Sequence, residues 1–134
     1  MKQSRVVVVV GDKRAAQYAK AVQAAAERLL VLSGKREGSF FIYLVGSKFM
    51  NKNVLSFPHT KGTPRPDMPG EFLGEVYINP FYIKRAGESL LTMVIHGFLH
   101  LLGYDHVRTH DRIVMEQKEK IFEERLKESQ FQNL

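Results

Sequence analysis

The sequence predicts one α+β domain over residues 1–134, with a small mixed β-sheet of about four strands packed against helices and a metal site on a buried helix. Three observations lead to this fold class. Short apolar runs of strand length are separated by longer segments in which apolar residues recur at helical spacing. The segments follow the order β-α-β-β-β-α-α along the chain. One helical segment, residues 88–102, is apolar on nearly every side and still contains two histidines.

The N-terminal part of the chain predicts two strands joined by a helix. Five consecutive valines at residues 6–10 indicate a buried strand. Asp12 is a suitable N-cap for a helix over residues 13–32, where alanines and leucines recur at helical spacing. A second apolar strand covers residues 40–45 and ends at Gly46. Because a helix connects the two strands, we expect them to pair in parallel through a right-handed crossover.

The middle of the chain predicts two more strands separated by a loop. A short strand covers residues 54–57, and Pro58 ends its ladder because proline has no N–H to donate. Residues 59–70 are rich in proline and glycine, which predicts a surface loop of a length that often carries function. Residues 74–79 alternate as a strand does, and Pro80 closes it.

The C-terminal part predicts two helices of different character. Residues 88–102 form the buried helix, because apolar side chains occupy nearly all of its surface. Residues 111–128 form an amphipathic helix with a charged outer face. Its predicted inward residues are Ile113, Val114, Ile121, Phe122 and Leu126.

Three histidines in residues 96–106 have the spacing of a metal site. His96 and His100 lie four residues apart, so they share one face of the helix. Gly103 falls where this helix would end, and the chain can then turn back and bring His106 toward the pair. Three imidazoles make a zinc site, and three ligands leave a coordination position open for water, as in catalytic sites. The alternative interpretation is a set of hydrogen-bonded core histidines.

Gly97 follows the first of these histidines, and its absent side chain allows two interpretations. It could let a substrate strand approach the metal, or it could let the helix pack tightly. Zinc proteases with a His-Glu-x-x-His motif carry a glutamate at this position as the general base. A glycine there therefore argues against a protease.

The composition limits which residues could bind a metal, which partners the chain favours and where in the cell we expect the protein. The chain contains no cysteine, so histidines and carboxylates must hold any zinc. The formal net charge of +6 favours polyanionic partners, although the basic residues are spread along the chain. The valine run is too short for the core of a signal peptide, and no segment is long enough to cross a membrane. We therefore expect a cytoplasmic protein without a membrane partner. The sequence makes no prediction of oligomeric state.

Several segments carry a resemblance to a known family. Residues 96–106 resemble the signature His-Gly-x-Leu-His-Leu-x-Gly-Tyr-Asp-His of the YbeY family of bacterial rRNA-processing endoribonucleases. Residues 53–58 and residues 73–78 are similar to two strands of that family. Met115 and Glu119 correspond to a methionine and a glutamate that follow the family's histidine motif.

The resemblance implies a zinc-dependent endoribonuclease specific for single strands, with one zinc per chain held by His96, His100 and His106. It also implies roles in maturation of the 3′ end of small-subunit rRNA and in ribosome quality control. The expected partners are single-stranded RNA, rRNA and the small ribosomal subunit. Two other functions remain open: a zinc hydrolase of peptides or small molecules, and a non-catalytic ribosome-associated module whose zinc only holds the fold.

The chain departs from the family pattern upstream of residue 53. Family members usually carry an Asn-x-x-Tyr-Arg segment there, whereas this chain has no arginine between Arg36 and Arg65. A phosphate near the metal needs a cationic partner. Lys48 and Lys52 are the only cations in the shortened loop, and Arg65 lies in the proline-rich loop. The candidates for this phosphate clamp are Arg65, whose guanidinium can grip two phosphate oxygens, and Lys48.

Overall fold

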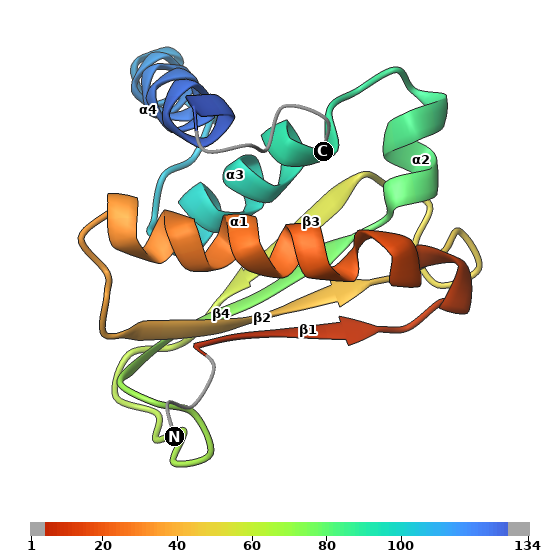
Figure 1. Cartoon of the computed structure of the whole chain (residues 1–134). Coiled ribbons are helices and arrows are strands. Elements are labelled where there is room, and N and C mark those ends of the chain that lie inside the picture. Colours follow the sequence, from red (N-terminus) through yellow and green to blue (C-terminus); the bar gives the residue numbers. More distant parts are fainter. Residues whose placement is uncertain (1–4, 129–134) are drawn as a thin grey trace.

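The computed structural model describes residues 5–128 and consists of one four-stranded sheet with helices on one of its faces (Figure 1). Over this range no helix combines the length and the apolar character needed to cross a bilayer. The elements in chain order are β1 (Val6–Val10), the 3₁₀ helix η1 (Lys13–Tyr18), α1 (Ala19–Leu32), β2 (Gly38–Leu44), β3 (Val54–Pro58), β4 (Glu71–Ile78), α2 (Pro80–Arg85), α3 (Leu90–Leu101) and α4 (Thr109–Glu128).

The sheet is mixed, as the sequence predicts. Its strand order is β1-β2-β4-β3. The predicted parallel pairing of the first two strands is confirmed, with Val6 opposite Phe40 and Val10 opposite Leu44. Strand β4 is also parallel to β2, whereas β3 pairs with β4 in the antiparallel direction and forms one edge of the sheet.

Strand β1 forms the other edge, and α1 covers its beginning. The predicted burial of this strand is therefore wrong beyond Val6, and Val9 and Val10 are exposed. The side chain of Glu27 accepts a hydrogen bond from the backbone N–H of Val6 at 3.1 Å. The side-chain amide of Gln23, one helical turn earlier, donates to the carbonyl of the same valine and to Glu27. Two side chains of α1 thus occupy both backbone groups of the first residue in this edge strand.

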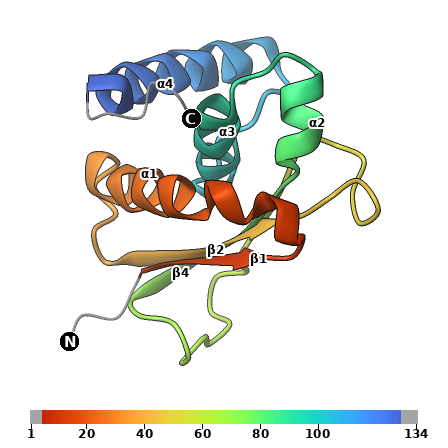
Figure 2. The same cartoon turned by 45° about the vertical axis from the view of Figure 1, so that its right-hand side comes forward.

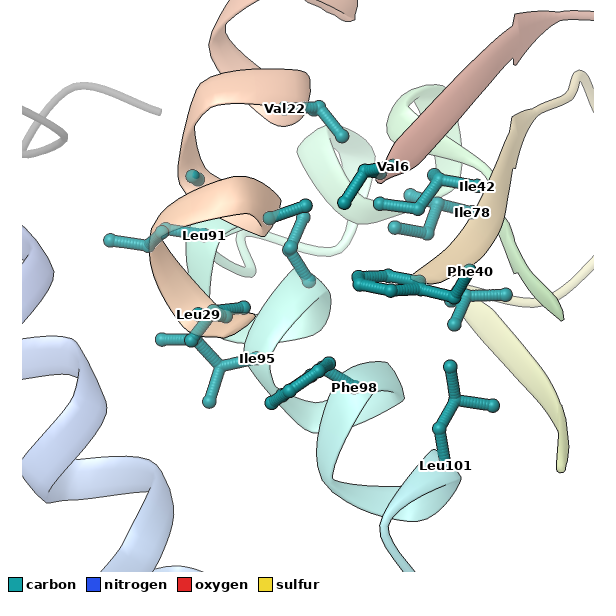
Figure 3. Close-up of a cluster of buried hydrophobic side chains, with 14 of the residues drawn as sticks. Val6, Val22, Leu29, Phe40, Ile42, Ile78, Leu91, Ile95, Phe98 and Leu101 are labelled. Carbon is teal, nitrogen blue, oxygen red and sulfur yellow. The ribbon is translucent and has the colours of Figure 1, made fainter. Parts of the chain in front are cut away.

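The hydrophobic core lies between the sheet and helices α1 and α3 (Figures 1 and 2). Strand β2 alternates so that Phe40, Ile42 and Leu44 are buried on the helix side. Figure 3 shows side chains from α1, α3 and the strands converging in this layer, with Phe40 near Phe98 at a ring-centroid distance of 5.3 Å. Among the described elements, no helix covers the opposite face of the sheet.

The sequence pattern does not predict helix α2, because it assigns Pro80 only to the end of a strand. Proline fits the first turn of a helix, where its missing N–H would have no partner. The preceding Asn79 is fully buried and caps this turn, since its Oδ1 accepts from the N–H groups of Phe81 and Tyr82, both at 3.1 Å. Its amide donates to the carbonyl of Met50 at 2.7 Å, which ties the β2–β3 loop to the start of α2.

Helix α4 buries part of the predicted inner face and exposes the rest. Ile113 and Ile121 are 47% and 48% exposed, so their predicted burial is wrong. The predicted burial of Phe122 and Leu126 is confirmed, Val114 is half-buried, and Met115, for which no burial was predicted, is buried as well. The inner face also carries the charged side chain of Glu119, so hydrophobic periodicity alone assigns the two isoleucines to it wrongly.

Close packing of α3 on the sheet decides between the two interpretations of Gly97. A Cβ atom at this position would lie 2.6 Å from Cγ1 of Val76 and 3.1 Å from Cγ2 of Val54. The hydroxyl of Ser56 also donates to the carbonyl of Gly97 at 2.9 Å. The glycine therefore allows the helix backbone to rest directly on β3 and β4.

Replacing Gly97 by alanine should lower the free energy of unfolding by about 1–3 kcal/mol, because the added methyl group overpacks the contact with Val76. Urea unfolding followed by circular dichroism measures this change. The matched control is Gln117→Ala on the exposed side of α4, which should leave the midpoint unchanged. Equal stability of Gly97→Ala and the parent protein would show that α3 can shift outward at little cost.

Candidate metal centre

Helix α3 and the loop after it bring three histidines together. His96 and His100 lie one turn apart on the same face of α3. Gly103 has φ of 97°, a conformation that costs a residue with a side chain and that reverses the chain after the helix. In the returning loop, the carboxylate of Asp105 accepts the N–H of Val107 at 3.2 Å, which shapes the turn around His106.

The geometry of the three imidazoles suits a single metal ion. One nitrogen from each ring lies within 4.8 Å of the others. The Nε2 atoms of His96 and His100 are 3.1 Å apart. Two nitrogens bound to a tetrahedral zinc ion at 2.0–2.1 Å would lie about 3.3 Å apart, so this pair is already close to ligand spacing. These histidines could therefore hold a metal ion.

Glu119 of α4 orients the first imidazole. Nδ1 of His96 lies 2.9 Å from Oε1 of Glu119, and both side chains are largely buried. Because a carboxylate only accepts hydrogen bonds, Nδ1 carries the proton and the lone pair of Nε2 faces the other two histidines. One turn earlier in α3, the hydroxyl of Thr92 donates to Glu123 at 2.7 Å. The two bonds hold α3 and α4 together in antiparallel order.

The environment of His100 favours its neutral form. Burial lowers the pKa of this imidazole below its ordinary value, and repulsion from His96 and His106 lowers it further. A neutral imidazole keeps the lone pair that a metal needs. The half-buried position therefore prepares this side chain for binding a cation.

Two hollows adjoin the histidines. The larger one, which we call the metal groove, has a volume of about 670 Å³. It runs between the edge strand β3 and the histidine motif, and Lys52 and Ser56 are among its lining residues. The smaller one, the α4 hollow, has a volume of about 310 Å³ and is lined by His96, His106, Arg112, Met115, Glu116 and Glu119. A substrate could therefore reach the histidines from either side.

The two predicted clamp residues lie away from both hollows. Arg65, in the loop between β3 and β4, forms an ion pair with Asp67 at 2.7 Å. Its guanidinium lies over the rings of Phe41 and Phe72, at 5.0 and 4.6 Å from their centroids. Lys48 is exposed in the loop between β2 and β3 and lines neither hollow. Their assignment as a phosphate clamp stays a prediction.

Two other cations lie at the hollows. Lys52 lines the metal groove, and Arg112 lines the α4 hollow. Arg112 makes no side-chain hydrogen bond or ion pair with the residues that the structure describes. Sequence reasoning missed it, although it lies seven residues before Glu119, which places both side chains on one face of a helix.

Comparison with known proteins finds one family. The family model described as "Endoribonuclease YbeY" matches residues 46–127, which include β3, β4, α2, α3, the three histidines and most of α4. A protein named Endoribonuclease YbeY from Rhizobium etli (strain CIAT 652) is 42% identical over 72 residues, which cover 48% of this chain and 42% of the relative. A protein with the same name from Thermodesulfovibrio yellowstonii is 39% identical over 74 residues, which cover 46% of this chain and 45% of the relative. The chain thus spans less than half the length of these relatives.

Metal binding should depend on the histidines and, to a smaller degree, on Glu119. We expect one divalent ion per chain in the parent protein and none in His100→Ala, which removes a ligand. Glu119→Gln keeps the shape but loses the charge that orients His96, so metal affinity should fall about 10–100-fold. Competition with a chelating indicator and elemental analysis measure both effects.

A matched control is His110→Ala, which removes an exposed imidazole outside the site and should leave the metal content unchanged. A folded parent protein that takes up no divalent ion would contradict the metal site. Equal affinity in Glu119→Gln would contradict the orienting role of the carboxylate.

Proposed function

The chain belongs to the YbeY endoribonuclease family, and we propose from this that it cuts single-stranded RNA with the help of a zinc ion, one per chain. The proposed ligands are His96, His100 and His106. The observation that carries the proposal is their convergence beside an open groove that also holds a lysine. The proposed process is maturation of the 3′ end of small-subunit rRNA and ribosome quality control in the cytoplasm, with rRNA and the small ribosomal subunit as partners.

The donor set supports zinc. Imidazole nitrogens are ordinary zinc ligands, and hard ions such as Mg²⁺ prefer oxygen ligands. A zinc ion held by three protein ligands supplies a Lewis acid that polarises a phosphoryl oxygen and lowers the pKa of water. Glu119 keeps the proton of His96 on Nδ1, so that Nε2 remains available to the metal.

In this reaction the cations at the two hollows would stabilise negative charge on the phosphate. Hydrolysis of a phosphodiester builds negative charge on the phosphate, and positive groups in fixed positions lower the barrier. Lys52 adds charge from the metal groove, and the guanidinium of Arg112, which no described side chain pairs with, can grip two phosphate oxygens from the other side. Arg65 and Lys48 line neither hollow, and we propose that they contact the RNA backbone away from the cut.

A second candidate function, hydrolysis of peptides, has one structural observation in its favour. Strand β3 is an edge strand and lines the metal groove, so an extended peptide could add to it. Against this function, the position after His96 is a glycine that packing requires, and the helix therefore offers no general base there.

An assay with four substrates tests the proposed function. We expect the zinc-loaded protein to cut single-stranded RNA in preference to duplex RNA, single-stranded DNA and peptides, and His100→Ala to lose this activity. RNA binding should weaken as salt rises, because phosphate contacts release counterions. Cleavage of peptides without cleavage of RNA would favour the second function. Binding of RNA without any cleavage would favour the non-catalytic module.

Cation variants test how the phosphate is held. Lys52→Ala and Arg112→Ala should each lower cleavage at least about tenfold, on the order of 1.4 kcal/mol of transition-state stabilisation, because each removes charge beside the scissile phosphate. Arg65→Ala or Lys48→Ala should also lower the cleavage of long RNA at least about tenfold. Single-turnover rates measure these effects, and none of the four variants should alter zinc content.

Gln117→Ala on the exposed side of α4 serves as the control and should keep the parent rate. If Lys52→Ala, Arg112→Ala and their double variant all cleave within twofold of the parent rate, the phosphate charge is balanced by other groups.

A further inference from the structure

The face of the sheet opposite the helices is rich in aromatic side chains. We call it the open face, since no helix among the described elements covers it (Figures 1 and 2). Phe41 and Tyr43 of β2 alternate with the buried residues of that strand and therefore point to this side. Phe57 of β3 and Tyr77 of β4 lie on the same face, and their rings meet edge to face at 5.7 Å.

Three rings on the open face form a stack that ends in an exposed phenylalanine. Tyr43 and Tyr77 are stacked at 4.6 Å between centroids with planes 12° apart. Phe49, from the β2–β3 loop, stacks on Tyr77 at 5.7 Å and 14°. Phe49 is 69% exposed, and Phe57 beside the stack is 51% exposed. These flat apolar surfaces are open to a planar ligand.

Polar groups within the open face favour a nucleobase over an apolar protein surface. The hydroxyl of Tyr43 donates to the carboxylate of Glu75 at 3.0 Å, in the middle of the aromatic residues. Burying this carboxylate under an apolar partner would cost free energy, whereas the N–H groups of a base can donate to it. Burial, together with the nearby Glu75, raises the pKa of Tyr43 and of Tyr77, so both stay uncharged near neutral pH.

Cations link the open face to the metal groove. In the β2–β3 loop, exposed Lys48 and Lys52 flank Phe49, and Lys52 also lines the groove beside the histidines. At the other end of the face, the guanidinium of Arg65 lies over the rings of Phe41 and Phe72. Aromatic rings interleaved with basic side chains are the pattern by which proteins hold single-stranded nucleic acid.

We propose that the open face is a binding site for single-stranded RNA that extends from the metal groove past the β2–β3 loop. Phe49 and Phe57 stack on bases, while Lys48, Lys52 and Arg65 contact the backbone. The proposal rests on the proposed function for the choice of RNA as the ligand. It adds a second site, which holds nucleotides that flank the cut.

The test measures binding apart from cleavage. Zinc-loaded protein is titrated with a phosphorothioate-linked single-stranded RNA decamer, which a gel shows to be intact afterwards. Phe49→Leu keeps an apolar side chain but removes the ring, so affinity should fall at least fivefold, the lower range for loss of one stacked base. Phe49→Trp keeps a ring and should bind as tightly as the parent protein. Because the chain has no other tryptophan, quenching of its fluorescence by RNA reports stacking directly.

Ile121→Ala, which removes from α4 an apolar side chain about as exposed as Phe57, is the matched control and should bind normally. Unchanged affinity in both Phe49→Leu and Phe57→Leu would overturn the proposal. So would self-association of the protein that Phe49→Leu abolishes while RNA affinity stays the same, because a second copy would then be the occupant.

Cleavage of two substrates separates this proposal from the proposed function. Phe49→Leu should cut a long RNA at least fivefold more slowly at limiting substrate and cut a trinucleotide at the parent rate. RNA binding that depends on Phe49, in a protein that never cleaves RNA, would reject the endoribonuclease function and keep the binding site. Equal losses on both substrates would place Phe49 in the cleavage step and overturn its role at a flanking site.

Discussion

The rest of the site depends on the contact between helix α3 and the sheet at Gly97. This residue allows the helix backbone to approach β3 and β4 more closely than a side chain would permit, and the bond from Ser56 holds it there. The depth of this packing sets the distance between the histidines and the edge strand. The metal groove therefore has its width because one residue of α3 lacks a Cβ atom.

The second constraint is the charge carried into the interface between α3 and α4. A carboxylate in a largely buried position costs free energy unless it is paired, and Glu119 is paired with His96. The same interface contains the bond between Thr92 and Glu123. The inner face of α4 is therefore not purely apolar, because it carries the glutamate that orients the imidazole of His96.

Local patterns predicted most of the fold and the centre of the site. The valine run at residues 6–10 and the apolar segment at residues 88–102 predict a strand and a helix close to the observed bounds. The predicted burial of the valine strand is wrong beyond its first residue, because β1 lies at the edge of the sheet. The convergence of His96, His100 and His106 follows from a four-residue spacing and a glycine, both of which are local. Pro80 was misinterpreted because proline both ends strands and begins helices, and only the buried cap of Asn79 decides between them.

The remaining features depend on contacts between segments far apart in the chain. The location of Arg65 on the open face follows from the path of a long loop, which no periodicity describes. Arg112 and Glu119 become recognisable as neighbours of the histidines only when the inner face of α4 is known.

The contacts at the start of strand β1 also bear on aggregation. Edge strands recruit further strands and lead to aggregation, and five valines in a row are a strong template for this. Gln23 and Glu27 occupy the first backbone groups of that edge and so shorten the length on which a fibril could begin to grow.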